Sequence, residues 1–174
     1  SAGISPIAGV DEAGRGACAG PLVIASVVLN DPFAPELAVV RDSKEIPESK
    51  RDAVFELIHQ VAASVSVVIV PASEVDARGV HAANLDGMRR AVQGLNVEPA
   101  YVLTDGYAIE GLGVPNLAVW KGDQVVVSIS AASVIAKVTR DRIMREMDNE
   151  FPQYGFAGHK GYITAAHTQA LNEH

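Results

Sequence analysis

Four acidic side chains in this sequence stand where a predicted strand or helix meets a glycine or another small-residue turn. They are Asp11, Glu12, Asp105 and Asp123. Taken singly, an acid at such a place is more often a solvated turn residue or a helix cap than a ligand. Four of them next to apolar segments favour a shared site, because sites in α/β proteins often form at the carboxyl ends of strands.

Carboxylate oxygens are the ligands that hard divalent cations such as Mg²⁺ prefer. A pair of such ions held by three or four carboxylates can stabilise the attacking and the leaving oxygen of a phosphoryl transfer. The sequence has a single cysteine, Cys18, and no Cys/His cluster of the kind that binds zinc. The acids therefore predict a site for two hard divalent ions and phosphoryl-transfer chemistry.

Asp11 and Glu12 are adjacent, which limits how both can reach one site. Neighbouring residues of a regular strand point to opposite faces of the sheet. We therefore expect the first strand to end or bend at this pair. The glycines Gly14 and Gly16, which follow closely, make such a bend easy.

The elements that must position these acids are predicted from apolar periodicity. Strands are expected over 7–10, 22–29, 65–70, 101–104 and 117–120. Helices are expected over 47–61, 81–95 and 125–149, with a short helical turn over 73–78 and a last helix capped by Thr164. This order predicts an α/β fold, with a mixed sheet flanked by helices, in a single domain over 1–174.

Composition bounds the function further. No apolar run approaches the roughly 18 residues needed to span a bilayer, and residues 1–6 do not resemble a secretion signal. The lone Cys18 agrees with a reducing cytoplasm, where we expect the protein to act away from membranes. The net charge of -7 argues against a nucleic-acid partner, but bound divalent ions would cancel part of that charge where a phosphate sits.

Several blocks of the sequence, taken together, resemble the successive signature blocks of the ribonuclease HII family. They appear in that family's order and cover nearly the whole chain, from about Ile7 to Leu171. The blocks are Gly-Val-Asp-Glu-Ala-Gly-Arg-Gly at 9–16, Asp-Ser-Lys at 42–44, Asp-Gly at 105–106, the segment 131–141 and the segment 161–167.

The resemblance implies a ribonuclease H-like mixed sheet with a helical C-terminal part. It implies an endonuclease that hydrolyses the RNA strand of RNA–DNA hybrids and cuts 5′ of ribonucleotides embedded in duplex DNA, leaving 5′-phosphate and 3′-hydroxyl ends. Two ions, Mg²⁺ or Mn²⁺, would be held by the four acids. By analogy Asp11 bridges both ions, Asp123 shares the ion that activates water, and Glu12 with Asp105 holds the ion facing the leaving oxygen.

Substrate recognition is also implied by the resemblance. Gly14, Arg15 and Gly16 would read the ribose 2′-hydroxyl, since backbone without Cβ can approach a sugar closely. Tyr162 resembles the family tyrosine that packs on a sugar at the junction of RNA and DNA. Without the resemblance, a plain glycine turn and a packing tyrosine would be the ordinary interpretations.

The remaining polar candidates are assigned more simply. Candidates for phosphate contacts are Lys44, Lys137, Arg140 and Lys160, with hydrogen bonds from Ser43 and Ser133. Basic residues on a helix more often face solvent, and Arg140 could instead pair with Asp141. No catalytic role is assigned to His81, His159 or His167, because single histidines are more often structural.

Two other functions fit part of the pattern. Another metal-dependent nuclease of the same fold has no need of a block that senses a 2′-hydroxyl, and a non-catalytic hybrid-binding module gains nothing from acids beside phosphate. We expect a monomer that binds RNA–DNA hybrids and ribonucleotide-containing duplex DNA. The chain ends at His174, before a basic and aromatic C-terminal segment common in relatives, and losing that segment would weaken substrate binding.

Overall fold

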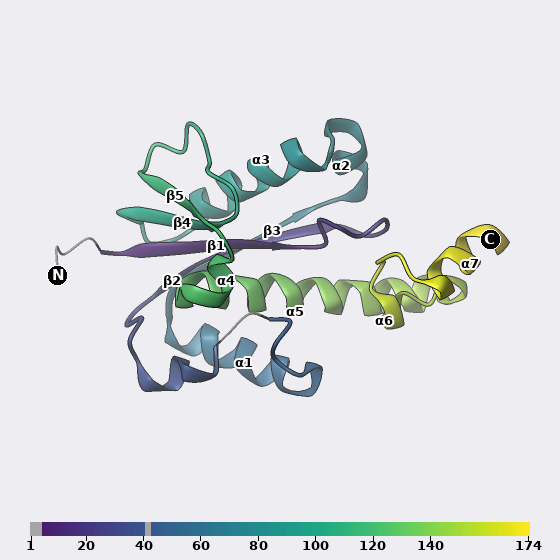
Figure 1. The fold of residues 1–174 in the computed structure, drawn as a ribbon, viewed down its shortest axis with the longest axis horizontal. Helices are drawn as coiled ribbons and strands as arrows, with labels where there is room; N and C mark the ends of the chain where they lie inside the picture. Colours follow the sequence, from purple (N-terminus) through teal and green to yellow (C-terminus); the bar gives the residue numbers. More distant parts are fainter. Residues whose placement is uncertain (1–4, 41–42) are drawn as a thin grey trace.

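The computed structural model describes residues 5–40 and 43–174. Its centre is a five-stranded mixed sheet in the order β3-β2-β1-β4-β5 (Figure 1). β2 is antiparallel to β1 and β3, whereas β4 is parallel to β1 and to β5. The strands are β1 (Ile7–Ala13), β2 (Leu22–Leu29), β3 (Ala62–Val70), β4 (Tyr101–Asp105) and β5 (Asn116–Val119). The predicted α/β fold with a mixed sheet is confirmed.

Helices cover both faces of this sheet (Figure 1). In the described part of the chain they are α1 (Glu48–Val61), α2 (Ala72–Arg78), α3 (Val80–Gln93), α4 (Gly122–Val125), α5 (Val127–Glu150), α6 (Phe156–His159) and α7 (Ala165–Glu173). Two 3-10 turns, Pro35–Val39 and Pro152–Tyr154, complete the elements. The C-terminal helices α6 and α7 lie at the far end of α5, so the predicted helical C-terminal part is present.

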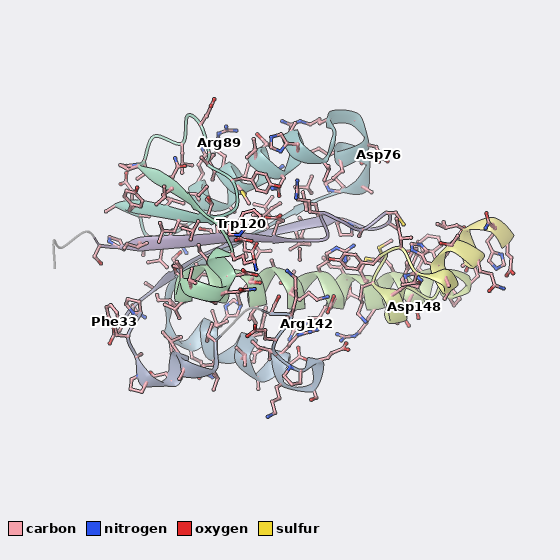
Figure 2. The ribbon with its side chains drawn as sticks, in the orientation of Figure 1. Phe33, Asp76, Arg89, Trp120, Arg142 and Asp148 are labelled. Carbon is pink, nitrogen blue, oxygen red and sulfur yellow. The ribbon has the colours of Figure 1, made fainter. Side chains whose placement is uncertain are left out.

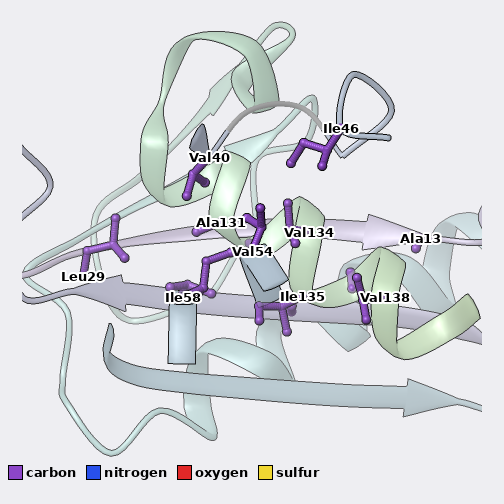
Figure 3. Close-up of a cluster of buried hydrophobic side chains, with 14 of the residues drawn as sticks. Ala13, Leu29, Val40, Ile46, Val54, Ile58, Ala131, Val134, Ile135 and Val138 are labelled. Carbon is purple, nitrogen blue, oxygen red and sulfur yellow. The ribbon is translucent and has the colours of Figure 1, made fainter. Parts of the chain in front are cut away.

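Two apolar cores lie on the two faces. α1 and α5 pack on one face, where Val54, Ile58 and Ile135 meet inward residues of β1 and β2 (Figure 3). α3 packs on the other face, where Met88 and Ala91 meet the alternate residues of the same strands. Every residue of β2 is buried, because the strand is central and covered from both sides, which explains its unbroken apolar run.

The close approach of α5 to β1 depends on a glycine. A Cβ at Gly9 would lie 2.1 Å from the backbone carbonyl carbon of Ser128, in the first turn of α5. No side chain fits there, so helix and strand meet backbone to backbone. This contact holds the start of α5 against the first half of β1, just before Asp11.

Several element boundaries differ from the sequence prediction. The helix expected over 125–149 is α5, which begins at Val127 because Val126 is extended (φ -124°, ψ 111°) and separates it from the short α4. β3 starts at Ala62 rather than at residue 65, because it pairs with β2 as far as Leu29. The predicted cap of the last helix is confirmed, with the Thr164 hydroxyl accepting from the His167 N–H at 3.1 Å. None of the helices in the described ranges is long and apolar enough to cross a membrane.

The first strand is the boundary that matters most for function. β1 neither ends nor breaks register at Val10: it continues to Ala13, paired with β2 throughout. Its other neighbour, β4, pairs with it only as far as Val10 opposite Thr104 and then turns away at Gly106. The last residues of β1 are therefore unpaired along one edge, although the strand itself is regular.

Candidate metal centre

The acids of β1, β4 and α4 converge at this open edge. One carboxylate oxygen from each of Asp11, Asp105 and Asp123 lies within 4.8 Å of the other two. Asp11 follows the last residue pair of the parallel β1–β4 ladder, and Asp105 is the last residue of β4. The carboxyl ends of parallel strands share one edge of a sheet, which brings these two acids together.

Local backbone contacts fix the other two members of this group. The Gly122 N–H donates to the Asp105 carboxylate at 2.8 Å, which ties the start of α4 to the end of β4. Lys121, at φ 53°, makes the left-handed turn that directs the chain into α4. The Ser130 hydroxyl donates to the Asp123 carbonyl oxygen at 2.7 Å, and so holds α4 against α5. The break at Val126 is thus what turns Asp123 toward β1.

Asp11 lies in a negative and poorly hydrated environment. It is 5% exposed and receives a 2.7 Å hydrogen bond from the Glu12 N–H. Burial, and then the charges of Glu12 and Asp105, raise the pKa of Asp11 well above its ordinary value, although the Ser133 hydroxyl partly opposes this. A buried cluster of like charges is the environment that a bound divalent cation relieves, so these residues fit a metal.

Glu12 faces the other side of the sheet, toward α3. Burial raises the pKa of Glu12 to about 7, with Asp105 adding to the effect and Arg15 opposing it. Its Oε2 is buried without a hydrogen-bond donor, and the buried side-chain amide of Asn84 beside it makes no well-formed hydrogen bond either. The neighbouring acids of β1 therefore reach the open edge from opposite faces, which a regular strand allows only because β4 has ended.

A hollow of about 420 Å³ opens at the carboxylates, and we call it the first hollow. It brings together every predicted site residue except Asp123, Arg140 and Lys160. Beside Ala13 its lining residues are Asp11, Glu12, Gly14, Arg15, Gly16, Ser43, Lys44, Asp105, Ser133, Lys137 and Tyr162. Asp123 lines a neighbouring hollow of about 350 Å³, the second hollow, which also contains Glu12 and Asp105.

Comparison with known proteins shows the family of this chain. The family model described as Ribonuclease HII matches residues 8–174. The chain belongs to the ribonuclease HII family. It is 58% identical over 172 residues to the Ribonuclease HII of Acidothermus cellulolyticus, covering 99% of this chain and 56% of that protein. It is 59% identical over 169 residues to that of Mycobacteroides abscessus, covering 97% of this chain and 72% of that protein.

Solved structures of the family share the fold. The ribonuclease H2 of Pyrococcus horikoshii superposes with a TM-score of 0.84 at 28% identity, over 97% of this chain and 86% of that one. The RNase HII of Archaeoglobus fulgidus, solved in complex with PCNA, superposes with a TM-score of 0.84 at 26% identity, over 97% and 88%. The ribonuclease H-like sheet is confirmed. The chain spans little more than half the length of the Acidothermus protein.

The Gly14-Arg15-Gly16 signature of ribonuclease HII lies in the β1–β2 connection. Gly14 has φ +97°, and a Cβ there would lie 2.1 Å from Arg140 Nε. A Cβ at Gly16 would lie 4.0 Å from the nearest atom of the Tyr162 ring, so the loop passes directly beside that ring. The loop and Tyr162 therefore line one wall of the first hollow together.

Arg140 does not have the surroundings that the phosphate prediction required. It is 1% exposed, and its guanidinium donates to the carbonyl oxygens of Ala19, Pro21 and Lys160 at 3.0, 2.9 and 2.7 Å. Its ring contact is with Tyr162, at 5.3 Å from guanidinium carbon to ring centroid. We correct the prediction: Arg140 joins the glycine loop to the C-terminal loop and supports Tyr162, and its donors are directed at carbonyls rather than at the hollow.

Other predicted contacts differ in their surroundings. Lys160 is buried and its ammonium donates to the Ala157 carbonyl oxygen, so it too departs from the predicted phosphate contact. Lys137 lines the first hollow, and its ammonium forms an ion pair with the Asp141 carboxylate at 2.6 Å. The sequence prediction, by contrast, suggests Arg140 as the partner of Asp141. Lys44 is 80% exposed, with its ammonium 4.0 Å from Asp123.

The predicted serines lie together, and the three histidines pack against other side chains or backbone. The Ser133 and Ser43 hydroxyls are 3.0 Å apart, which links α5 to the Asp-Ser-Lys block; Asp42 lies outside the described residues. His167 is buried, with Nδ1 3.0 Å from the Tyr162 carbonyl oxygen, and its ring stacks on His159 at 4.1 Å. His81 packs on Tyr107. These histidine contacts are consistent with assigning none of the three to catalysis.

Sequence reasoning missed residues that the structure puts at the site. Asn84 could have been noticed as a polar residue on the apolar stripe of α3, in line with Met88 and Ala91. Trp120 and Lys121, which line the second hollow, directly precede the Gly-Asp that supplies Asp123. An aromatic and a basic residue beside a predicted ligand were the available signal.

Proposed function

We propose that this chain is a metal-dependent endonuclease that hydrolyses the RNA strand of RNA–DNA hybrids and cuts 5′ of ribonucleotides embedded in duplex DNA. The observation that carries the proposal is the opening of the carboxylate cluster into the same hollow as Gly14, Arg15, Gly16 and Tyr162. A nuclease indifferent to sugar chemistry needs the first feature and not the second.

Asp11, Glu12, Asp105 and Asp123 would hold two divalent ions, Mg²⁺ or Mn²⁺. Bound there, the ions supply an activated water and charge stabilisation for the leaving 3′-oxygen. Asp11, central among the acids, would contact both. Hydrolysis adds water to the phosphorus and breaks its bond to the 3′-oxygen, leaving a 5′-phosphate on the ribonucleotide and a 3′-hydroxyl on the preceding nucleotide.

The remaining residues would bind and orient the strand. The backbone of Gly14-Arg15-Gly16 can approach the ribose closely enough to exchange hydrogen bonds with its 2′-hydroxyl. Tyr162 would pack on a neighbouring sugar from the same wall. Lys44 and Lys137, with Ser43 and Ser133, line the hollow where backbone phosphates would lie. We also propose a monomer, to be checked by light scattering, acting in the cytoplasm.

The test is cleavage of a labelled DNA duplex that carries one ribonucleotide, in Mg²⁺, Mn²⁺ or chelator, beside an all-DNA duplex of the same sequence. We expect a cut 5′ of the ribonucleotide with either ion, none with chelator, and none in the all-DNA duplex. Equal cutting of both duplexes would indicate a general nuclease. Binding of the duplex without cutting in any ion would indicate a non-catalytic hybrid-binding module.

A further inference from the structure

The second hollow has a wall that the proposed chemistry does not use. It shares Glu12, Arg15, Lys44 and Asp105 with the first hollow and adds residues of its own. The two hollows therefore meet at the carboxylates and diverge from there. Besides the proposed ligand Asp123, the added lining residues are Gly106, Tyr107, Trp120, Lys121 and Gln124.

Trp120 is the large exposed aromatic side chain of this added wall. It is the only tryptophan in the chain, and it is 82% exposed. Single exposed apolar side chains are common, so exposure alone carries no argument. The position of Trp120 is different, because it directly follows β5 and stands three residues before Asp123. Figure 2 shows Trp120 near the middle of the view, whereas Phe33, another exposed aromatic, lies at the margin.

The backbone beneath Trp120 is held on both sides. The Gly106 N–H donates to the Val119 carbonyl oxygen at 3.1 Å, and the Gln124 N–H donates to the Lys121 carbonyl oxygen at 3.0 Å. These bonds join the segment to the end of β4 and to the first turn of α4, which carry two of the clustered acids. The backbone that carries Trp120 is therefore held in place relative to the carboxylates.

The chemistry around the indole suits a nucleic-acid strand. Lys121 is adjacent, and the Arg15 guanidinium lies 4.6 Å above the ring of Tyr107, at the boundary between the two hollows. Aromatic faces combined with cationic side chains bind nucleotides by stacking and by attraction to phosphate. An apolar ligand without charge would leave the basic residues unused.

We propose that the second hollow binds the nucleotides on the 5′ side of the scissile phosphate, and that Trp120 packs against a sugar or base of that strand. This rests on the proposed function. The ribose that Gly14-Arg15-Gly16 would read carries the 5′-phosphate after cutting, so the first hollow holds the 3′ side of the cut. If the scissile phosphate lies at the carboxylates, the strand continues past them toward its 5′ end. On that side of the carboxylates the second hollow begins.

The single tryptophan makes binding directly observable. Ca²⁺ replaces Mg²⁺ to form an uncut complex with a duplex carrying one ribonucleotide, and tryptophan fluorescence is followed as duplex is added. We expect a saturable change that coincides with binding measured by anisotropy of a labelled duplex. A second duplex, in which the strand that carries the ribonucleotide begins at that ribonucleotide, should bind without that change. Saturation by the full duplex with unchanged fluorescence would overturn the proposal.

Matched variants test the energetic role. Trp120→Ala should lower kcat/KM on the full duplex about tenfold, mostly through KM, which is the scale of losing one aromatic contact to a nucleotide. Trp120→Phe should keep most of the activity, and Phe33→Ala should be unchanged. No loss of kcat/KM for Trp120→Ala on the full duplex would contradict the proposal. So would a loss of affinity in Ca²⁺ that is equally large for the duplex that lacks the 5′ nucleotides. Failure of the proposed function is distinguishable, since the unmodified chain would then not cut the full duplex in Mg²⁺ or Mn²⁺.

Discussion

At the scale of single residues, the two adjacent acids of β1 have different surroundings. Asp11 faces α5 and the Ser133 hydroxyl, whereas Glu12 faces α3 and Asn84. Their charges still interact, and both pKa values are raised chiefly by burial. Two neighbouring carboxylates on opposite faces of the sheet can approach a shared phosphate from two sides. Two carboxylates on the same face could approach it from one side only.

Asp11→Asn should abolish cleavage while the protein stays folded. The amide has nearly the same volume, and removing a charge from a buried negative cluster costs no packing. We expect a loss of at least about a thousandfold in kcat, typical of losing a group central to transition-state charge stabilisation. Single-turnover cleavage measures the loss, and circular dichroism verifies the fold. A soluble variant with near-normal activity would exclude the metal assignment.

Tyr162→Ala should discriminate between substrates. Its ring lies beside the glycine loop, so its loss should reduce cleavage at a single embedded ribonucleotide much more than cleavage of a long RNA–DNA hybrid, which offers many registers. The carboxylates are untouched. Both substrates are compared at one salt concentration, because phosphate affinity varies steeply with salt. An equal loss on both would assign Tyr162 a general stacking or folding role.

At the scale of elements, α5 both lines the first hollow and holds the loops beside it. Ser133 and Lys137 line the first hollow, and one turn further Arg140 holds the loops that close it. Its start packs against β1 at Gly9, and its far end contacts α6. Any shift of this helix would therefore move the carboxylates and the loops held by Arg140 together.

Arg140→Lys should destabilise the protein although it keeps the charge. A lysine cannot reach all three carbonyl oxygens in the guanidinium's planar arrangement, so buried acceptors lose their donors. We expect a loss of about 2–4 kcal/mol in the free energy of unfolding. Arg142→Lys is the control, since Arg142 forms a surface ion pair with Asp52 that contributes about 0–1 kcal/mol. Urea unfolding of both variants gives the comparison, and equal stabilities would contradict the structural role of Arg140.

At the scale of the whole molecule, the net charge of -7 is partly concentrated at one edge of the sheet. That concentration opposes folding without metal and favours binding of cations. It also explains why the overall charge does not argue against the proposed nucleic-acid partner. The cluster contributes negative charge to the total while its metal-bound form would attract phosphate.

Divalent ions should raise the melting temperature, and more so at high pH. The pKa of Glu12 is near 7 in the folded protein against 4.5 for a free glutamate, so the metal-free protein loses stability as pH rises through this window. Metal competes with the bound proton and reverses that loss. Melting with millimolar Mg²⁺ or chelator should show a gain of about 5 °C at pH 8 and a smaller one at pH 5.

Asp11→Asn is the control for this measurement, because it removes one ligand and one repulsive charge. The variant should melt higher than the unmodified chain in chelator and gain less from Mg²⁺. A gain that does not depend on pH, or that is the same in the variant, would mean that the ions act elsewhere on the surface.

The sequence by itself determined the apolar strands, the order of the elements and the identity of the clustered acids. These features are local: strand and helix periodicity are visible within a few residues, and the acids stand next to turns. The tertiary structure decided the rest. Arg140 donates to Pro21, 119 residues away, so no window around Arg140 reveals its burial. Likewise, Asp11 and Glu12 can both reach one edge from a regular β1 only because β4 ends beside them. Pairing between segments distant in the sequence decides where β4 ends.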